Sequence, residues 1–516
     1  MEQPMRILTL VPPVPRSMKG APWFLREERH AAVDNTPTPP YMAPAILGMV
    51  RQALPHAEYR VIDAMAEQWD GRRIEAEVHA WRPDVIIGVV CANHLGEAEE
   101  RLCIELPYPT IAVVTPVGAD VAEAVELYRL KTRYFVATDE TEVTVTRAVQ
   151  ALSGQGAIEE TPGLVVNEDG KCRFTGFPGY SDMRTYPLPA FDLFPFDKYN
   201  RLQDEITRFR PEYRDTAIIN GMKGCPFHCS FCIVGSDVTR ARTKSGEQIF
   251  REVEYLHDRF GRRRFNFLDS EFAANKKTAK DFCRLVIESG MKIAFDVKNR
   301  IEFWDEDLLR LMKQAGCKRM FYGIETADPR LQAVIRKNLD LEKAKKAIAV
   351  TKQAGIEVHF FMMVGILGET RESLRLNAKF IAETKPDGIA WGILFPEVGS
   401  PLYEELKAKG LLLGKDWSDY RRFDGMTFRH DTYRSMDEIK AASLWMRNRY
   451  RWYLALDRTL PPRTRAAYLA RYAVGTINHV TWRLTSWHPA LRRLKSRVGG
   501  RFVAATARLG GQPQLL

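Results

Sequence analysis

The residues Gly224-Cys225-Pro226-Phe227-His228-Cys229-Ser230-Phe231-Cys232 place three cysteines on one short stretch, separated by three and two residues. Thiolates are soft ligands that suit iron–sulfur clusters and zinc. A zinc site normally takes four ligands from paired cysteines or histidines, and no second cysteine pair lies nearby in the sequence. His228 stands between two of the cysteines, where a short loop has difficulty aiming it inward. The stretch therefore predicts an iron–sulfur cubane held by three cysteines, with one iron left without a protein ligand.

Composition indicates a folded, multidomain chain. Its 516 residues exceed one ordinary core, and 45% of them are hydrophobic, so two or three domains are expected. The cysteines outside the triplet are scattered, which is typical of reduced thiols and not of a disulfide framework. The first apolar run, residues 7–11, is too short for a signal peptide, and no run approaches the ~18 apolar residues of a membrane span. We therefore expect a cytoplasmic protein.

Residues 1–150 alternate short apolar runs with longer helical patterns. Continuous apolar runs of this length indicate strands of a parallel sheet that is covered on both faces. The pattern predicts a doubly wound, Rossmann-like α/β domain, whose ligand would lie at the carboxyl ends of the strands. No G-x-G-x-x-G and no Walker loop follows the first strand. The glycine-rich loop that usually binds the phosphates of a dinucleotide or nucleotide is therefore missing, which disfavours both as ligands. The expected strands are 6–11, 59–63, 85–90, 110–114 and 134–137.

Residues 216–396 repeat an alternation of one strand and one helix six times. Several of the helical patterns end in glycine, as expected for a C-terminal cap. Six such units predict a partial barrel, and the cysteine stretch directly follows its first strand. The expected strands are 217–222, 264–269, 293–298, 319–325, 357–365 and 388–395.

The cysteine loop, with Phe231 before its last cysteine, resembles the cluster loop of radical S-adenosylmethionine (SAM) enzymes. In that family SAM chelates the open iron through its amino and carboxylate groups and is cleaved reductively to a 5'-deoxyadenosyl radical. The resemblance implies a partial TIM (βα)6 barrel over residues 213–403. It also implies that Cys225, Cys229 and Cys232 bind a [4Fe–4S] cluster and that Phe231 packs near the adenine of SAM.

The strand ends of the barrel supply further candidate ligands of SAM, because active residues of barrels lie at the carboxyl ends of strands. Asp269 and Glu271 follow the second strand, where the family's motif for the SAM amino group lies, although its usual Gly-Gly-Glu is not matched. Arg300 follows the third strand and is a candidate for a bidentate pair with the SAM carboxylate. Glu325 ends the fourth strand in a segment that resembles the family's Gly-Ile-Glu. For each of these charged side chains the alternative is a salt bridge at the barrel rim.

The fifth strand runs into Gly365-Ile366-Leu367-Gly368-Glu369-Thr370, which resembles the family's Gly-Leu-Pro-Gly-Glu-Thr turn beside adenine. Leu367 stands where the family usually has proline. Glycine lets a backbone approach a flat ring closely. Gly365 and Gly368 are therefore candidate contacts to SAM.

Placed ahead of this motif, residues 1–150 resemble the cobalamin-binding domain of the cobalamin-dependent radical SAM family. In that family the loops after the later strands surround the nucleotide tail of cobalamin, which makes Thr115, Gly118 and Thr138 candidate contacts. The Asp-x-His-x-x-Gly motif, which carries the cobalt ligand in cobalamin carriers, is missing. His94 lacks the Asp two residues earlier, and we interpret it as a histidine of a surface loop.

Two regions lie outside these domains. Residues 151–212 are expected to form a connector, with a hairpin around 167–170 followed by a strap stiffened by prolines. Residues 404–516 are expected to be helical and basic. Within them, residues 435–438 read as a capping box that opens a helix reaching about residue 457.

The net charge of +11 is concentrated in this C-terminal region. Residues 441–516 hold 13 Arg and one Lys against one acid, so residues 1–440 sum to −2. Arginine interleaved with tyrosine and tryptophan favours a peripheral contact with an anionic membrane, at the inner face for a cytoplasmic protein. The alternatives are a solvated helical cap on the barrel and, least favoured, a nucleic-acid contact.

The resemblance implies a cobalamin-dependent radical SAM methyltransferase. The adenosyl radical would abstract hydrogen from an unactivated carbon of a small molecule, and methylcobalamin would then supply a methyl group. The basic, aromatic tail favours a hydrophobic, lipid-like substrate, and an electron donor such as flavodoxin or ferredoxin is implied.

One alternative is a cyclase or rearrangement enzyme that uses the same cofactors without methyl transfer. Another is a transfer RNA methylthiotransferase, but Cys91 and Cys103 alone do not supply its second cysteine triplet. A non-enzymatic cobalamin or SAM sensor is the third.

Overall fold

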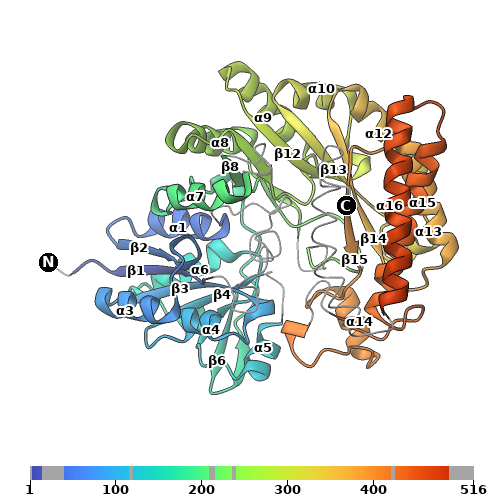
Figure 1. Ribbon diagram of the computed structural model, residues 1–516. Coiled ribbons are helices and arrows are strands. Elements are labelled where there is room, and N and C mark those ends of the chain that lie inside the picture. The colour runs from blue at the N-terminus through green and yellow to red at the C-terminus, as the bar shows by residue number, and fades with distance from the viewer. Residues whose placement is uncertain are drawn as a thin grey trace. The chain divides into compact units, whose positions relative to one another are not determined.

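The computed structural model describes residues 3–13, 40–115, 120–207, 215–234, 240–419 and 425–486 (Figure 1). The chain forms two compact units, and each is composed of several segments. The first unit comprises Met1–Asn299, Asp305–Lys318 and Pro396–Arg421. The second comprises Arg300–Trp304, Arg319–Phe395 and Arg422–Leu516. A boundary between units therefore falls inside the predicted barrel region, and the chain enters the first unit again after residue 395.

The first unit contains a seven-stranded sheet in the order β2-β1-β3-β4-β5-β6-β7. Its first five strands pair in parallel, as the apolar runs predicted. The expected hairpin is also present, but β6 pairs antiparallel with β5 and β7 pairs antiparallel with β6, so the hairpin extends the sheet instead of standing apart in a connector. The strands are β1 (Arg6–Val11), β2 (Glu58–Asp63), β3 (Val85–Cys91), β4 (Thr110–Thr115), β5 (Tyr134–Val136), β6 (Leu164–Glu168) and β7 (Lys171–Phe174).

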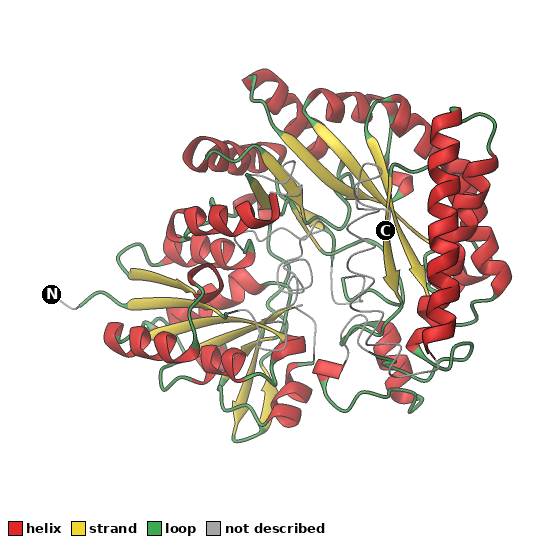
Figure 2. Cartoon of the chain, viewed as in Figure 1, coloured by secondary structure: helices red, strands yellow, loops and turns green. Residues whose placement is uncertain are grey.

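Helices follow the strands of this sheet in the alternation that a doubly wound domain requires (Figure 2). Three of them, α2, α3 and α5, start at aspartate caps, where Asp63, Asp70 and Asp120 accept hydrogen bonds from the backbone of the first turn. The helices are α1 (Met42–Ala53), α2 (Ala64–Glu67), α3 (Gly71–Trp81), α4 (Ala98–Glu105), α5 (Val121–Tyr128) and α6 (Thr141–Leu152).

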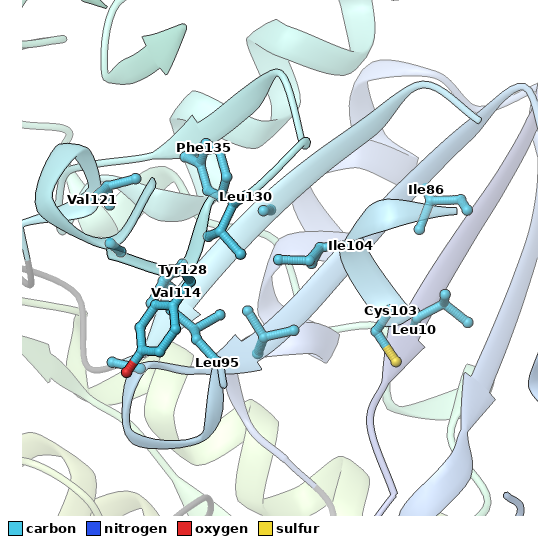
Figure 3. Close-up of a cluster of buried hydrophobic side chains, with 14 of the residues drawn as sticks. Leu10, Ile86, Leu95, Cys103, Ile104, Val114, Val121, Tyr128, Leu130 and Phe135 are labelled. Carbon is cyan, nitrogen blue, oxygen red and sulfur yellow. The ribbon is translucent and has the colours of Figure 1, made fainter. Parts of the chain in front are cut away.

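The core between the sheet and its helices is apolar and includes Leu10, Ile86, Val114 and Phe135 (Figure 3). A segment from far along the chain completes it: Trp417 is 1% exposed and belongs to the same cluster. Its ring meets that of Tyr128 edge-on at 6.1 Å between centroids, and its backbone N–H donates to the Tyr128 hydroxyl at 3.0 Å. The pattern of the sequence had placed this tryptophan in the C-terminal helical region, since a contact across nearly 300 residues leaves no local signal.

The first unit also holds the first half of the strand–helix series. Strands β8, β11 and β12 pair in parallel, and α8 begins with a complete capping box at Ser245 and Gln248. A short ribbon, β9 and β10, lies between β8 and α8. The elements are α7 (Phe196–Thr207), β8 (Thr216–Ile219), β9 (Met222–Lys223), β10 (Arg242–Thr243), α8 (Gly246–Phe260), β11 (Arg264–Phe267), α9 (Lys276–Ser289), β12 (Ala294–Asn299), α10 (Glu306–Gln314) and α14 (Pro401–Ala408).

A buried polar triad joins α1 to α8 inside this unit. The Tyr41 hydroxyl donates to Glu252 Oε2 at 2.8 Å, and the Lys244 ammonium pairs with the other oxygen of Glu252. All three residues are less than 9% exposed. Because a buried charge is tolerated only when it is paired, the triad fixes this junction in one arrangement.

The second unit carries the other half of the series. Strands β13, β14 and β15 pair in parallel, so all six predicted strands form. Helix α15 packs against α13 and against α16, and the three run side by side in Figure 1. The elements are β13 (Cys317–Glu325), α11 (Pro329–Val334), α12 (Leu341–Gln353), β14 (Glu357–Val364), α13 (Arg371–Thr384), β15 (Gly388–Ile393), α15 (Met436–Leu456) and α16 (Pro462–Ser486).

Helix α15 begins where the sequence predicted, but only half of its capping box forms. Ser435 Oγ accepts from Glu438 N at 3.2 Å, whereas the Glu438 carboxylate accepts from Arg434 N at 2.7 Å instead of from the N-cap residue. Within the described stretches of the chain, no helix combines the length and hydropathy needed to cross a bilayer.

Candidate active site

The cysteine stretch is a loop with a narrow neck. Strands β9 and β10 pair antiparallel, with Arg242 opposite Lys223 and Thr243 opposite Met222, and the loop leaves and returns through this pair. Gly224 adopts a φ of +71°, and a Cβ there would lie 2.5 Å from Arg240 O. Only glycine fits this position. The backbone thus confines the ends of the loop; residues 235–239 lie outside the described part.

The three predicted cluster ligands are all half-buried on this loop. Burial raises the pKa of the Cys225 thiol to about 12, and the nearby charges of Glu271, Cys232 and Cys229 act in the same direction. The other two cysteines therefore lie near enough to Cys225 for their charges to act on it. Among the described residues no three side chains already stand in metal-binding geometry. The donor chemistry nevertheless fits a cluster, whose cations would favour the thiolate forms and draw the ligands together.

The middle of the loop is held by α14. Ser230 O accepts a hydrogen bond from Leu402 N at 2.7 Å, and Ser230 is buried. Phe231, the next residue, is half-buried between the second and third cysteines. Its contact with adenine stays a prediction, and His228 is exposed.

Asp269 organises the start of the loop. Its Oδ1 accepts from Gly221 N at 2.6 Å and from Met222 N at 3.2 Å, and the side chain is buried. Burial raises the pKa of Asp269 to about 6, although both backbone hydrogen bonds act in the opposite direction. The structure therefore shows Asp269 as a support of the neck, and its contact with SAM stays a prediction.

Lys298, which the sequence analysis did not single out, is a further candidate residue of the site. It lies near the end of β12, and its Nζ donates to Leu268 O at 3.0 Å. Burial lowers the pKa of Lys298, while Asp269, Glu271 and Cys232 act in the opposite direction, which places this ammonium among the acids beside the cysteines. Glu271 is itself buried. The position of a lysine at a strand's carboxyl end was the available signal.

In the second unit, Glu325 and Arg300 form the contacts that the sequence analysis gave as their alternative. Glu325 Oε1 accepts from Lys337 Nζ at 2.9 Å, and Arg300 donates to Lys337 O at 2.8 Å and pairs with Glu302. Glu325 also has a φ of +61° beside an irregularity in the pairing with β14. Residues other than glycine with such a strained, left-handed backbone occur most often at functional sites. Their roles toward SAM stay predictions.

The glycine turn after β14 has a left-handed backbone at both glycines, with φ of +81° at Gly365 and +75° at Gly368. Its carboxylate, Glu369, accepts from Gly365 N at 3.0 Å and from the Tyr433 hydroxyl at 2.6 Å. Burial raises the pKa of Glu369 to about 7.

Residues 430–433, which the sequence analysis did not single out, brace this turn from outside. Gly365 O lies 2.8 Å from His430 Nε2, and Gly368 N donates to Asp431 Oδ2 at 2.8 Å. The turn is thereby held on both its backbone and its side chain. Contacts of Gly365 and Gly368 with adenine stay predictions.

The candidate cobalamin contacts lie at the carboxyl edge of the seven-stranded sheet. Thr115 is half-buried, and its hydroxyl donates to Val90 O at 3.1 Å. Thr138 is buried, and its hydroxyl has no partner within the described residues. A buried polar atom without a partner fits a ligand that would supply one. Gly118 lies outside the described residues.

His94 is fully buried at the end of β3, so its interpretation as a surface histidine was wrong. Its Nδ1 lies 3.1 Å from Glu97 Oε1. The short helical turn at residues 92–94 directs the ring inward, which a polar Asn-His-Leu-Gly pattern did not reveal.

Known proteins resemble this chain over most of its length. Residues 219–381 match the Radical SAM superfamily. An uncharacterized methyltransferase of Pyrococcus horikoshii is 26% identical over 440 residues, which cover 84% of this chain and 90% of the relative. The anaerobic magnesium-protoporphyrin IX monomethyl ester cyclase of Cereibacter sphaeroides is 23% identical over 72% of this chain and 60% of its own length.

A solved structure of the cobalamin-dependent SAM radical enzyme OxsB, with aqua-cobalamin and SAM bound, is similar in fold. Its TM-score is 0.67 at 14% identity, with 98% of this chain and 75% of OxsB covered. At this identity the likeness concerns the fold, and it extends from the seven-stranded sheet to the C-terminal helices.

Proposed function

We propose that the chain is a radical SAM enzyme of the group whose members also bind cobalamin, and that it methylates an unactivated carbon of a small molecule. One observation carries the proposal: the similarity to a methyltransferase extends over 84% of this chain and 90% of the relative. It therefore includes the sheet that precedes the cysteine loop as well as the strand–helix series that follows it.

When bound, the [4Fe–4S] cluster supplies the electron that splits SAM, and cobalamin carries the methyl group to be transferred. Cys225, Cys229 and Cys232 would hold the cluster on a loop whose start is fixed by Asp269. Lys298 adds a cation among the acids beside this loop. These groups position the loop before any cofactor arrives, which lowers the cost of ordering it at binding.

The second unit supplies the groups proposed to bind SAM. The turn at Gly365 and Gly368 offers a backbone that lacks side chains at two positions, braced by residues 430–433. Arg300 and Glu325 offer a guanidinium and a carboxylate that are buried and already hydrogen-bonded. Groups held in this way hold their orientation when a ligand binds.

Anaerobic reconstitution with iron, sulfide and hydroxocobalamin, followed by mass analysis of the products of SAM, tests the proposal. Methyl transfer predicts both 5'-deoxyadenosine and S-adenosylhomocysteine. Deoxyadenosine without the homocysteine product would remove methyl transfer and leave the radical chemistry. A preparation that binds no iron at the cysteine loop would remove both.

A second candidate is a cyclase or oxidative rearrangement enzyme with the same cofactors. It is favoured by the similarity to the magnesium-protoporphyrin cyclase over 72% of this chain, although this chain spans only 60% of that relative. The same assay distinguishes the two candidates, because the cyclase reaction forms no S-adenosylhomocysteine.

The basic C-terminal region supports a further part of the proposal, a hydrophobic substrate met at the inner face of the cytoplasmic membrane. Residues 441–516 carry 13 Arg among aromatic side chains, and surface arginines attract anionic lipid. Cosedimentation with vesicles of anionic and of neutral lipid tests this; equal recovery with both would remove it. Flavodoxin and ferredoxin are the proposed electron donors, to be compared by their support of SAM cleavage.

A further inference from the structure

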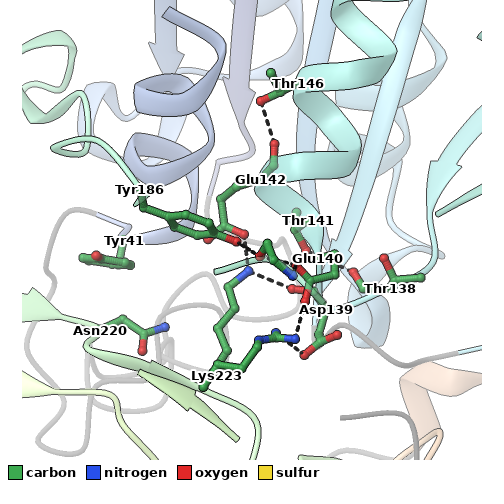
Figure 4. Close-up of polar contacts among 12 residues, drawn as sticks. Tyr41, Thr138, Asp139, Glu140, Thr141, Glu142, Thr146, Tyr186, Asn220 and Lys223 are labelled. Atoms are coloured by element: carbon green, nitrogen blue, oxygen red, sulfur yellow. Dashed lines mark hydrogen bonds and ion pairs between the residues drawn. The ribbon is translucent and has the colours of Figure 1, made fainter. Parts of the chain in front are cut away.

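The neck of the cysteine loop is fastened to the loop between β5 and α6 by a network of charges (Figure 4). Lys223 Nζ donates to Asp139 O at 2.7 Å and pairs with the Glu142 carboxylate. Arg242, opposite Lys223 in the ribbon, pairs with Asp139 Oδ2 at 3.0 Å and with Glu140. Both cations of the neck therefore end on the same four-residue segment.

This network is buried. The side chains of Lys223 and Arg242 are 12% and 9% exposed, and those of Asp139, Glu140 and Glu142 are 15%, 0% and 7% exposed. A buried charge must remain paired, so neither side moves without the other. A salt bridge on the surface would transmit no such constraint.

The acidic side is held from a second direction. Ser181 donates to Glu140 Oε2, and its hydroxyl lies 2.7 Å from the hydroxyl of Tyr186. The Lys223 ammonium lies 5.8 Å from the centre of the Tyr186 ring. The segment 139–142 thus contacts both the neck and the residues that follow the hairpin.

Each end of the network leads directly to a cofactor site. Lys223 is followed by Gly224 and the first cluster ligand, Cys225. Asp139 is preceded by Thr138, whose buried hydroxyl lacks a partner among the described residues. Only Gly224 lies between Lys223 and the first cluster ligand, and no residue lies between Asp139 and Thr138.

We propose that Lys223 and Arg242 are positioning residues that couple the seating of the cluster to the binding of cobalamin. The inference rests on the cofactors of the proposed function. Cobalamin held against Thr138 restrains residues 139–142, and these restrain the neck through the two cations. Coupling between two sites is reciprocal, so the cluster tightens cobalamin binding by the same factor.

The experiment titrates hydroxocobalamin, followed by absorbance, into protein with a reconstituted cluster and into protein stripped of iron by a chelator. The wild-type dissociation constant is expected to be about tenfold lower with the cluster present. Conversely, cobalamin should slow the loss of iron to a chelator. In Lys223→Met/Glu142→Gln, both partners of one buried pair become neutral, so no unpaired charge is left, and the ratio of dissociation constants should approach one.

A matched control uses another buried pair of the same unit. Arg264 and Asp296 lie 2.5 Å apart, with side chains 12% and 2% exposed, and neither adjoins the neck in sequence. Arg264→Met/Asp296→Asn should keep the wild-type ratio. Circular dichroism checks that each variant is folded, and Arg242→Lys, which keeps the charge, serves as a milder variant if the double replacement does not fold.

The outcomes separate this inference from the proposed function. A wild-type ratio of one, or a ratio that the Lys223 and Arg242 variants leave unchanged, overturns the coupling while both cofactors still bind. If Arg264→Met/Asp296→Asn brings the ratio of dissociation constants to one as well, the loss reflects general loosening of the unit, and the proposed coupling is overturned too. Wild-type protein that binds no cobalamin at all overturns the proposed function, and the coupling with it.

Discussion

Asp269 Oδ1 lies 2.6 Å from Gly221 N, so a side chain that follows one strand holds the backbone that follows its neighbour. This contact leads to the first prediction. Asp269→Ala leaves the buried N–H of Gly221 without an acceptor and takes one acceptor from the N–H of Met222, which should lower the free energy of unfolding by about 1–3 kcal/mol. Urea denaturation measures this. Asp269→Asn keeps one acceptor oxygen and should lose less, so equal losses in the two variants would contradict the role assigned to these hydrogen bonds.

The raised pKa of Glu369 predicts a pH dependence of stability. Burial moves this pKa from 4.5 to about 7, so the folded protein binds a proton that the unfolded chain releases. Protonated Glu369 therefore raises the free energy of unfolding by up to about 3 kcal/mol, and this contribution is fully present below pH 4.5. It decreases as the pH rises through about 7, the pKa of the group in the folded protein. Denaturation of wild type and Glu369→Gln at pH values from 4.5 to 7 measures it. The difference between the two proteins should change steadily with pH; a constant difference would exclude the shift.

Thr138 allows ligand binding to be separated from stability. Its buried hydroxyl has no partner among the described residues, so Thr138→Val should leave the unfolding midpoint unchanged or slightly raised. If the hydroxyl meets cobalamin, the same variant should bind hydroxocobalamin about fivefold to tenfold more weakly, the loss of one hydrogen bond. Thr146→Val is the control, because its hydroxyl donates to Glu142 O at 2.7 Å within α6. It should lose stability and keep the affinity for cobalamin.

Trp417 tests the membership of residues 396–421 in the first unit. The ring is 1% exposed within the apolar cluster of the seven-stranded sheet. Trp417→Ala should therefore lower the free energy of unfolding by about 3–5 kcal/mol. Leu413→Ala, at a side chain 44% exposed in the same segment, should change it by less than about 0.5 kcal/mol. Similar effects of the two replacements would show that the segment does not fill the core.

Local patterns predicted the elements well. Apolar runs located the parallel strands, and local spacing located the start of α15 at Ser435, because each depends on residues that are close in sequence. The same reasoning placed the cysteines on one loop after β8. It did not predict that β6 and β7 would join the sheet. The sequence of a hairpin indicates that its two strands pair with each other, but it does not indicate which other strand they will pair with.

The missed site residues share one property: their partners are distant in the chain. Lys223 meets Glu142 across 81 residues, and Asp431 meets Gly368 across 63. A lone lysine or aspartate is usually solvated, so nothing in its neighbourhood marks it. His94 was misjudged for the related reason that its burial depends on packing, which a polar local sequence conceals.

The arrival of Trp417 in the core of the seven-stranded sheet also bears on synthesis. Most of the strands and helices that surround it lie before residue 140 and leave the ribosome long before it does. Until residues 396–421 have emerged, the apolar side chains around Tyr128 lack the tryptophan that covers them in the complete fold. The first unit therefore completes its folding late. A chain truncated after β15 would leave the apolar side chains that pack against Trp417 exposed to solvent.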